Sequence, residues 1–498
     1  MRLLLPLLLI LSCLAMLLPG CEPKEELLTR DPSATLEFST DTVLFDTVFV
    51  QTGSVTKRLW VYNRNARAVR VEQISLANPG STTYTVTVGG DVGTTARNVT
   101  IRGKDSLLVL VKAFIDPSPS ETKPFLVEEE LRFETNGNDQ RVKLVAYGQN
   151  AYFHNAQRLC TQTWRSDKPH VIYNSVLVSR GCVLTIEAGT RIYSHAGSAI
   201  IVQGTLLVNP VFQPGTTEVK PDDRNIVRFA ADRRERFYDE IPGQWQGIQF
   251  DSTSSRNNVV RYTELKNAAF GLLVYNPGNV TPHPRVTVEN CVIKNISGAL
   301  LSFASGGQTF EGAGIFSFSG DFDVTNTLFT NCGEYAVRGI GGAFDLDFCT
   351  VANYTPRFNR KTASLWFTNE PAVRRVPAPL PLSISVTNSI VWGSVADELF
   401  FKNIGTSYQP SIRNSLLRTD EFKSVFGGNS NLLNIYPKFR RAPETPAADK
   451  FDFRLDTLSP ASNRPLLRPL APNVQRDLRN NLRSATAPDL GAYERLNP

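Results

Sequence analysis

Methionine and histidine are scarce in this chain of 498 residues, with two Met and four His. So few histidines leave little for a histidine-rich metal centre. An excess of one charge is also missing, because 53 Lys and Arg residues face 47 Asp and Glu residues and leave a net charge of +6. This small excess argues against a dedicated nucleic-acid-binding protein. Hydrophobic residues at 41% and charged residues at 20% argue against intrinsic disorder and against a polytopic membrane protein.

Cysteine is sparse too, and five of the seven cysteines follow residue 21. Their odd number and their spacing match no zinc-binding pattern. Cys160 and Cys182 are the only pair that we consider for a disulfide. We interpret Cys291, Cys332 and Cys349 as small core residues.

The first 21 residues predict export. Arg2 precedes an apolar run over residues 3–18, which is typical of a signal peptide and short for a spanning helix. The following Pro19-Gly20-Cys21 resembles a bacterial lipobox, which implies a diacylated Cys21 as the mature N-terminus. The alternative is an ordinary signal peptide that is cut nearby. The acidic tether at 22–32 is similar to that of Bacteroidetes-type lipoproteins, which implies an anchor in the outer membrane, facing either the cell surface or the periplasm.

Residues 33–150 consist of short alternating segments separated by turn residues. We expect strands at 42–50, 58–62, 69–74, 83–88, 98–101, 106–111, 130–133 and 142–146. This spacing predicts an antiparallel β-sandwich. The segments 59–63, 105–109 and 131–137 resemble immunoglobulin-like modules of the spindle-protein and sperm-protein type, which act as spacers or binding domains.

Residues 151–440 contain an internal repeat. Four copies align at 261–267, 289–295, 325–331 and 347–353, and weaker copies follow at 387–393 and 413–419. Irregular spacing around a fixed core predicts a solenoid with variable loops. Alternation predicts two inward columns, one running from Val288 to Ile412 and one from Leu265 to Leu417, which differ in phase and therefore need a bend between them.

Asparagine occupies one position in each of the four main copies, at Asn267, Asn295, Asn331 and Asn353. Stacked about 4.8 Å apart, these amides are expected to bond to one another as a structural ladder. The alternative is a ligand site lined with asparagine. With the segments 181–190, 202–208 and 245–250, the repeat resembles right-handed parallel β-helices of the pectin-lyase-like type. The resemblance implies an all-β fold and no particular activity.

Residues 441–498 are irregular and rich in proline. Segments such as 488–494 resemble the closing part of exported β-helix proteins. Because a parallel solenoid ends in an open sheet edge, we expect this segment to be a cap.

One acidic cluster is a candidate site. Asp323 and Asp345 share a register in adjacent coils, and Asp347 lies two residues further along the same face. Stacked carboxylates repel one another, so a divalent cation such as Ca²⁺ or an anionic glycan held through it is one interpretation. Solvated surface charge is the other. The Asp and His signatures of pectin-cleaving glycosidases are missing from the sequence.

A basic loop and two tryptophans are candidate glycan contacts. Arg360 and Lys361 lie in the long loop 356–381, with Trp366 nearby. Trp392 is expected in an outward column with two lysines of earlier coils. Basic and aromatic side chains together suit an anionic glycan. The alternatives are an ordinary exposed loop and a tryptophan packed under a loop.

No set of residues demands a reaction, and no catalytic residue or cofactor is assigned. We therefore predict a lipid-anchored envelope protein that binds a glycan or a neighbouring envelope protein, with no nucleic-acid partner. A polysaccharide lyase or glycoside hydrolase acting on an anionic polysaccharide is one alternative, and a structural spacer is another.

Overall fold

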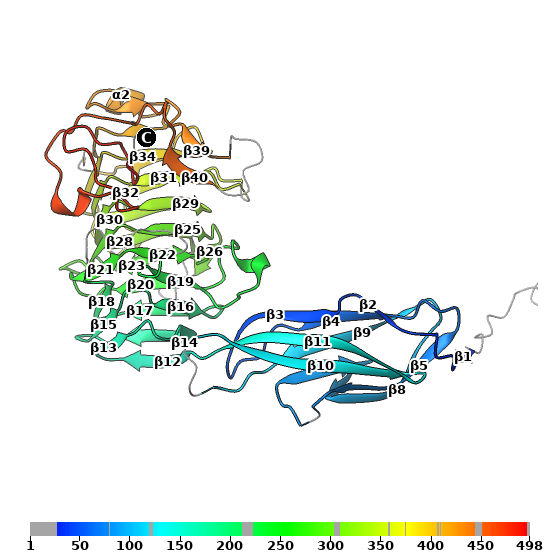
Figure 1. The fold of residues 1–498 in the computed structure, drawn as a ribbon. Coiled ribbons are helices and arrows are strands. Elements are labelled where there is room, and N and C mark those ends of the chain that lie inside the picture. The colour runs from blue at the N-terminus through cyan, green and yellow to red at the C-terminus, as the bar shows by residue number, and fades with distance from the viewer. Residues whose placement is uncertain are drawn as a thin grey trace, which may run out of the picture. The chain divides into compact units, whose positions relative to one another are not determined.

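The computed structural model describes residues 27–78, 80–118, 123–211, 223–302, 309–356, 359–373, 375–405, 408, 410–443 and 451–495. The chain divides into two compact units, Met1–Asn150 and Ala151–Pro498 (Figure 1). Within the described ranges, helix is limited to α2 (Lys423–Phe426) and the 3-10 turns Arg236–Tyr238 and Pro472–Val474. The fold is therefore all-β, as the sequence predicted.

The first unit is built from two sheets. One contains β1 (Leu28–Thr29), β5 (Ala68–Leu76), β8 (Thr95–Ile101), β10 (Phe125–Thr135), β11 (Asn138–Gln149) and β3 (Thr42–Phe49). The other contains β2 (Glu37–Phe38), β4 (Lys57–Tyr62), β9 (Ser106–Ala113), β6 (Tyr84–Val88) and β7 (Asp91–Gly93). Each of the eight expected strands falls on one of these strands.

Aromatic contacts join the two sheets into a sandwich. The rings of Phe45 and Tyr84, one from each sheet, have centroids 5.8 Å apart, and those of Phe38 and Phe133 are 4.8 Å apart. The expected purely antiparallel pairing is wrong in two places, because β1 pairs with β5 and β11 pairs with β3 in parallel. The two strands concerned, β1 and β3, come from the start of the unit and form the two edges of their sheet. Each is far in sequence from its partner, so no tight hairpin joins them and parallel pairing is possible.

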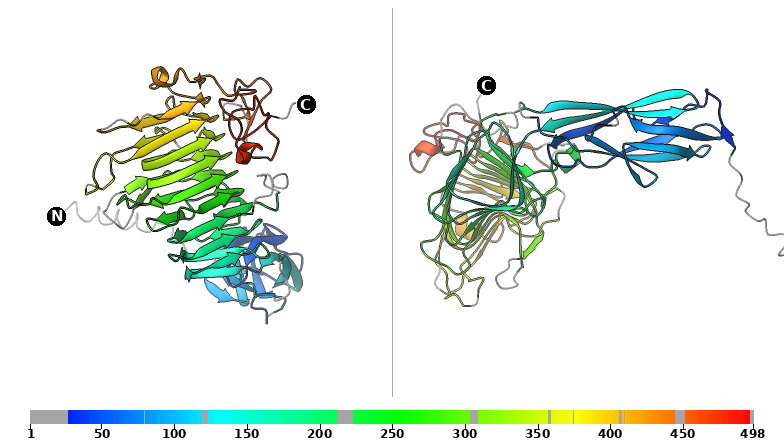
Figure 2. Two further views of the ribbon diagram at one scale, coloured as in Figure 1. Left: turned by 90° about the vertical axis from the view of Figure 1, so that its left-hand side faces the viewer. Right: turned by 90° about the horizontal axis from the view of Figure 1, so that it is seen from below.

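The second unit is a parallel β-helix. Twenty-five strands, β12 to β38 without β26 and β27, form one continuous sheet that winds into coils. Within this winding sheet, each strand also pairs with the equivalent strand of the next coil. The stacked strands form three faces that run along the solenoid, which are called its first, second and third sheets below (Figure 2).

A complete coil contributes one strand, or one part of a long strand, to each sheet. The first sheet contains β17 (Ala199–Val202), β20 (Gly247–Asp251), β23 (Leu272–Tyr275), the first parts of β28 (Ala313–Thr325) and β30 (Tyr335–Asp347), β32 (Leu365–Thr368) and β35 (Leu399–Lys402). The second contains β15 (Val183–Ile186), β18 (Thr205–Val208), β21 (Asn258–Arg261), β24 (Arg285–Glu289), the last parts of β28 and β30, β33 (Leu382–Thr387) and β36 (Ser411–Arg413). The third contains β16 (Arg191–Ser194), β19 (Val227–Ala231), β22 (Thr263–Lys266), β25 (Val292–Ile296), β29 (Leu328–Cys332), β31 (Thr350–Asn353), β34 (Ile390–Gly393), β37 (Leu416–Leu417) and β38 (Leu432–Leu433).

The predicted inward columns are confirmed. Val288, Val324, Leu346, Val386 and Ile412 pair in register, as do Leu265, Ile293, Phe329, Val351, Val391 and Leu417. All of them belong to one buried core. The predicted bend between the columns is a residue with positive φ in every coil, at Tyr262, Asn290, Asn326, Phe348, Asn388 and Asn414. Asparagine tolerates this backbone region better than most residues, which explains why it recurs there.

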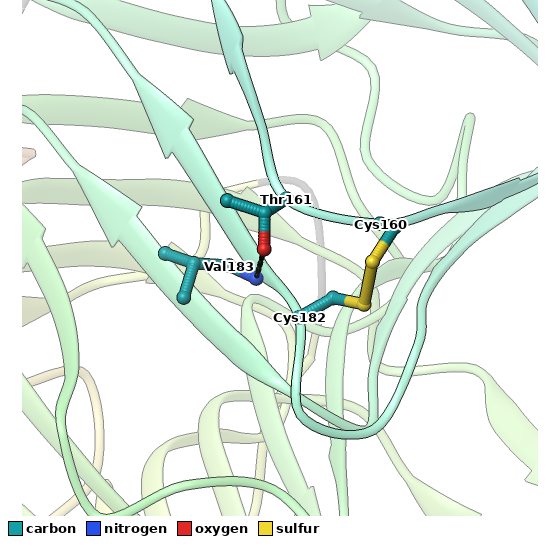
Figure 3. The surroundings of a disulfide bond; sticks show 4 residues. All are labelled: Cys160, Thr161, Cys182 and Val183. Atoms are coloured by element: carbon teal, nitrogen blue, oxygen red, sulfur yellow. Dashed lines mark hydrogen bonds between the residues drawn. A yellow bond between two sulfur atoms is a disulfide. The ribbon is translucent and has the colours of Figure 1, made fainter.

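The first coils contain β12 (Tyr152–Leu159), β13 (Gln162–Trp164) and β14 (His170–Val178). A disulfide joins Cys160, after β12, to Cys182, before β15, with Cα atoms 4.8 Å apart (Figure 3). Beside it the N–H of Val183 donates to Oγ1 of Thr161 at 3.2 Å. The pair singled out in the sequence is therefore confirmed. Cys291, Cys332 and Cys349 are free and buried, also as predicted.

The end of the solenoid is covered differently from our expectation. Phe422 and Phe426, around α2, pack against Phe401 of the last coils, and Phe426 belongs to the solenoid core. The described part of the C-terminal segment, 451–495, lies instead along the outer face of the third sheet. It covers apolar side chains such as Val292, Leu328, Ile390 and Leu416, which would otherwise face water.

Candidate functional site

The predicted asparagine ladder has three connected members. Nδ2 of Asn295 donates to Oδ1 of Asn267 at 3.2 Å, and Nδ2 of Asn331 donates to Oδ1 of Asn295 at 2.6 Å. All three are left-handed residues at the end of a third-sheet strand. Asn353 lies at the same register, but its Oδ1 accepts the backbone N–H of Cys332 at 2.8 Å. These hydrogen bonds all join groups within the protein, either side chain to side chain or side chain to backbone. They therefore favour a structural role of the ladder over a ligand site.

We expect Asn295→Ala to lower the free energy of unfolding by about 1–3 kcal/mol, because it leaves buried amide partners unpaired. Chemical denaturation with a fluorescence readout measures this change. Asn295→Gly is the matched control, since glycine keeps the positive φ of 54° while losing the amide. Equal stability of the alanine variant and the wild type would contradict the ladder.

The acidic cluster does not gather as a set of metal ligands. Asp323 and Asp345 pair in register, as predicted, but the carboxylate of Asp323 is engaged by Arg285. Asp347 is 6% exposed and accepts from Nδ2 of Asn388 at 2.8 Å. Nη2 of Arg468, from the C-terminal segment, lies 3.3 Å from Asp347. The described residues contain no group of three His, Cys, Asp or Glu side chains that could hold a metal ion.

Arg360 is not an exposed glycan contact. Its guanidinium is fully buried and makes two parallel bonds to Glu398, with Nη2 to Oε1 at 2.7 Å and Nη1 to Oε2 at 2.9 Å. Nη2 also donates to the carbonyl of Asn353 at 2.6 Å. The neighbouring Lys361 is exposed. Arg360 therefore fastens the base of its loop to the coil, and its partner could not be identified from the sequence spacing.

Trp366 is half-buried on the outer face of the first sheet. Its ring stacks on Phe400 of the next coil, with centroids 5.4 Å apart, and the guanidinium of Arg338 lies 4.9 Å from its centroid. Arg338 is itself paired with Glu311 of β27 (Thr309–Glu311) at 2.7 Å. Trp366 is thus part of an apolar cluster over this sheet. This packing argues against a glycan contact at Trp366 and was not expected from the exposed-loop alternative either.

Trp392 does lie in the predicted outward column. The column runs Lys266, Lys294, Thr330, Ala352 and Trp392 over successive coils. Tyr436 meets the indole with centroids 6.0 Å apart, and Trp392 is 6% exposed. The ring of Trp392 is therefore packed, as the alternative to a sugar platform expected. Trp392 also lines a hollow.

One hollow lies where three first-sheet strands end. Its volume is about 470 Å³, within the range of small-molecule sites. Gln203 follows β17, Asp251 ends β20 and Tyr275 ends β23, so the three share one register on successive coils. Ser252, Thr253, Gln249 and the loop 276–280 complete the lining.

The polar groups of this hollow are held in place. Nε2 of Gln203 donates to Oδ2 of Asp251 at 3.1 Å, and Nε2 of Gln249 donates to Oδ1 at 2.8 Å. The ring of Tyr275 is braced edge-on by Phe318, with centroids 5.6 Å apart. Asn276 fastens the wall through Val280, whose N–H donates to Oδ1 of Asn276 at 2.9 Å. A carboxylate flanked by two amides beside an aromatic ring suits the hydroxyls and the C–H face of a sugar.

Asp251 is the one acidic residue that lines this hollow among the described residues. Hydrolysis by the usual glycosidase mechanism needs two carboxylates about 5–9 Å apart. A single carboxylate can accept hydrogen bonds from a bound sugar but cannot supply both the acid and the base of that mechanism.

The sequence did not predict this hollow or one further polar contact. Aligning Gln203 with Asp251 and Tyr275 was possible in principle, but 48 residues separate the first two and hide their shared register. The further polar contact joins two histidines, because Nε2 of His154 lies 2.9 Å from Nδ1 of His170. Both rings stack on Trp164.

Cys21 lies outside the described residues. Within the described ranges, no helix is both long and apolar enough to cross a membrane.

Comparisons with known proteins give little. No family model matches the chain, and no curated protein matches its sequence. A protein of unknown function from Porphyromonas gingivalis aligns at 11% identity over 26% of this chain and 60% of its own, with a TM-score of 0.17. The VesB protease of Vibrio cholerae aligns at 14% identity over 23% of this chain and 32% of its own, also with a TM-score of 0.17.

A family 123 glycoside hydrolase from Clostridium perfringens aligns at 9% identity over 25% of this chain and 26% of its own, again with a TM-score of 0.17. The chain thus spans less than two thirds of each of these three structures. Similarities of this size carry no argument about what the chain binds, and the function must be argued from its own residues.

Proposed function

We propose that this protein is a cell-envelope glycan-binding protein whose β-helix holds a saccharide in the hollow around Asp251. The observation that carries the proposal is the arrangement of one carboxylate between two glutamine amides beside the ring of Tyr275. Sugar hydroxyls pair with such groups, and the C–H face of a pyranose packs on an aromatic ring. Ser252 and Thr253 add hydroxyls at the rim.

Several features support a place in the cell envelope. The lipobox-like Pro19-Gly20-Cys21 provides an anchor, and the disulfide between Cys160 and Cys182 suits an oxidising compartment. We propose that a lipid on Cys21 holds the protein at the outer membrane while the β-helix meets the glycan.

Loss of binding on substitution of the hollow tests the proposal. The full-length protein in detergent is screened on a glycan array, and the best ligand is titrated by calorimetry. We expect Asp251→Asn to weaken binding about tenfold or more, since one lost charged hydrogen bond is worth about 1.5–3 kcal/mol. Tyr275→Ala should also weaken binding, because it removes the ring on which the C–H face of the sugar packs. Asp323→Asn, on the second sheet, is the matched control and should bind normally.

Three other results would contradict this function. Retention of no glycan by the wild type would favour a structural spacer or a protein partner. Equal binding by Asp251→Asn and the wild type would place the ligand elsewhere. Release of new reducing ends or of unsaturated products from a polysaccharide would establish an enzyme.

We expect Cys21→Ser to release the protein from membranes, because two buried acyl chains provide the anchor. Fractionation of cells after ultracentrifugation, with labelling by a fatty-acid analogue, measures this. Cys13→Ser lies within the apolar run and is the matched control, which should remain membrane-bound and labelled. Membrane retention of Cys21→Ser equal to that of the control would disprove the lipid anchor.

A further inference from the structure

Arg418 has no acidic partner among the described residues, unlike the buried arginines Arg360 and Arg338. Arg360 and Arg338 are each paired with a glutamate. Arg418 is half-buried, yet among the described residues the carbonyl of Gly393 is the one hydrogen-bond partner of its side chain. Its guanidinium lies over the ring of Trp392, 5.1 Å from the centroid. Stacking fixes the plane of the guanidinium from one side and leaves several of its five N–H donors without a protein acceptor.

Arg418 lines a second hollow, of about 390 Å³. Trp392, Arg418 and Asn434 stand above one another on successive coils, because the N–H of Arg418 donates to Val391 at 3.0 Å and that of Asn434 donates to Leu417 at 2.8 Å. Tyr436 closes one side of the hollow. The site is separate from the hollow around Asp251 and shares no residue with it.

The rim of this second hollow is built rigidly. Oδ1 of Asp397 accepts from the hydroxyl of Thr419 at 3.0 Å and from the N–H groups of Asp420 and Glu421 at 2.6 and 2.7 Å. The side chain of Asn434 binds both the N–H and the carbonyl of Thr419, each at 2.9 Å. The turn that presents Asp420 is therefore fixed without a ligand.

Two further observations point to a ligand here. The buried indole N–H of Trp392, on the hollow's wall, has no hydrogen-bond partner among the described residues. Nζ of Lys423 lies 2.5 Å from Asp420, and both side chains are more than half exposed. An exposed ion pair is held weakly, so a ligand anion can exchange with it. Of the residues that line the hollow, Arg418 and Lys423 are cationic and Asp420 is anionic.

We propose that the Arg418 hollow binds the carboxylate of an acidic sugar residue. A planar carboxylate matches the fork of an arginine in two parallel hydrogen bonds. Asp420 then accepts from sugar hydroxyls, and the ring of Tyr436 packs against the C–H face. The negative charge of Asp420 disfavours doubly charged phosphate or sulfate in the same place. The site does not depend on the function assigned to the Asp251 hollow.

The test uses the full-length protein in detergent and defined probes. Calorimetry compares a galacturonate trisaccharide and a glucuronate-containing oligosaccharide with their carboxyl-reduced, neutral forms, and inorganic phosphate is titrated alongside. We expect the wild type to bind at least one acidic form and to bind its reduced form at least tenfold more weakly. Arg418→Gln should lower affinity for the acidic form by the same factor.

Matched variants distinguish recognition of the carboxylate by Arg418 from a general effect of lost positive charge and from loss of the folded structure. Arg413→Gln removes an exposed arginine from the neighbouring strand and should bind normally. Arg418→Lys keeps the charge without the planar fork and should bind with intermediate affinity, which also covers the case in which Arg418→Gln fails to fold. Asp251→Asn should leave the acidic ligand bound.

Any of four results would overturn the proposal. These are equal affinity for acidic and reduced sugars, no binding of either acidic sugar, displacement by phosphate at comparable concentration, and an equal loss in Arg413→Gln. Loss of the acidic ligand in Asp251→Asn with normal affinity in Arg418→Gln would move the carboxylate to the other hollow.

Discussion

Arg360→Met should lower the stability of the β-helix by about 3–5 kcal/mol, the usual cost of breaking a buried ion pair from one side. The side chains of Arg360 and Glu398 are both 0% exposed. Oε2 of Glu398 also accepts from the hydroxyl of Ser364 at 2.5 Å, and Oε1 accepts the N–H of Val395 at 3.1 Å. Removing the guanidinium leaves a carboxylate in the core with only neutral donors.

Urea unfolding monitored by circular dichroism measures this loss. Lys361→Met is the matched control, because the same substitution at the exposed neighbouring residue should change stability by less than about 0.5 kcal/mol. In Arg360→Met/Glu398→Leu no buried charge remains, so much of the stability should return. A single variant as stable as the Lys361→Met control, or a double variant that loses the sum of both single effects, would contradict a tightly coupled pair.

The sequence predicted what repeats from coil to coil. Val288 and Val324 or Asn267 and Asn295 could be aligned because each coil places the same side chain at the same height. The need for a bend was also visible in the phase change between the two columns. The sequence did not show that asparagine usually forms this bend, because Tyr262 and Phe348 occupy the same position in two of the coils.

What lies in loops was not predictable in this way. Arg360 pairs with Glu398, which lies 38 residues further along the chain. The loop between them has a length that does not recur in other coils, so an alignment of the coils does not bring the two residues together. The basic and aromatic composition of the loop indicated a glycan contact, although burial makes Arg360 structural. For the Asp251 hollow, the residues come from strand ends rather than from the repeat core. An alignment based on apolar core positions therefore could not indicate that these side chains lie together.

Histidine pairing is the clearest case of a contact hidden in the sequence, and it predicts a pH effect. Stability of the β-helix should fall as the pH drops from about 6.5 to about 4. Burial, helped by the neighbouring His154, lowers the pKa of His170 to about 4, although the Arg165 carbonyl and Asp167 act in the opposite sense. Burial also lowers the pKa of His154. The two side chains are 3% and 9% exposed.

The hydrogen bonds of His170 require its ring to be neutral. Nε2 of His170 lies 3.1 Å from the carbonyl of Arg165, which only accepts, so this nitrogen carries the proton. Nδ1 of His170 must then accept, and the Nε2–H of His154 donates to it at 2.9 Å. A second proton on Nδ1 of His170 would face that N–H directly. Protonation therefore breaks the chain of bonds and puts a charge between stacked rings.

Because the pKa of His170 is lower in the folded protein than in the unfolded chain, the unfolded chain binds the proton first as the pH falls. The stabilisation is complete above about pH 6.5 and is lost progressively down to about pH 4, a total of about 3 kcal/mol. Thermal unfolding of wild type and His170→Gln between pH 7.5 and 4 measures the effect. The slope should flatten in His170→Gln and persist in His195→Gln, whose side chain is 50% exposed. Equal slopes in wild type and His170→Gln would show that carboxylates elsewhere carry the acid sensitivity.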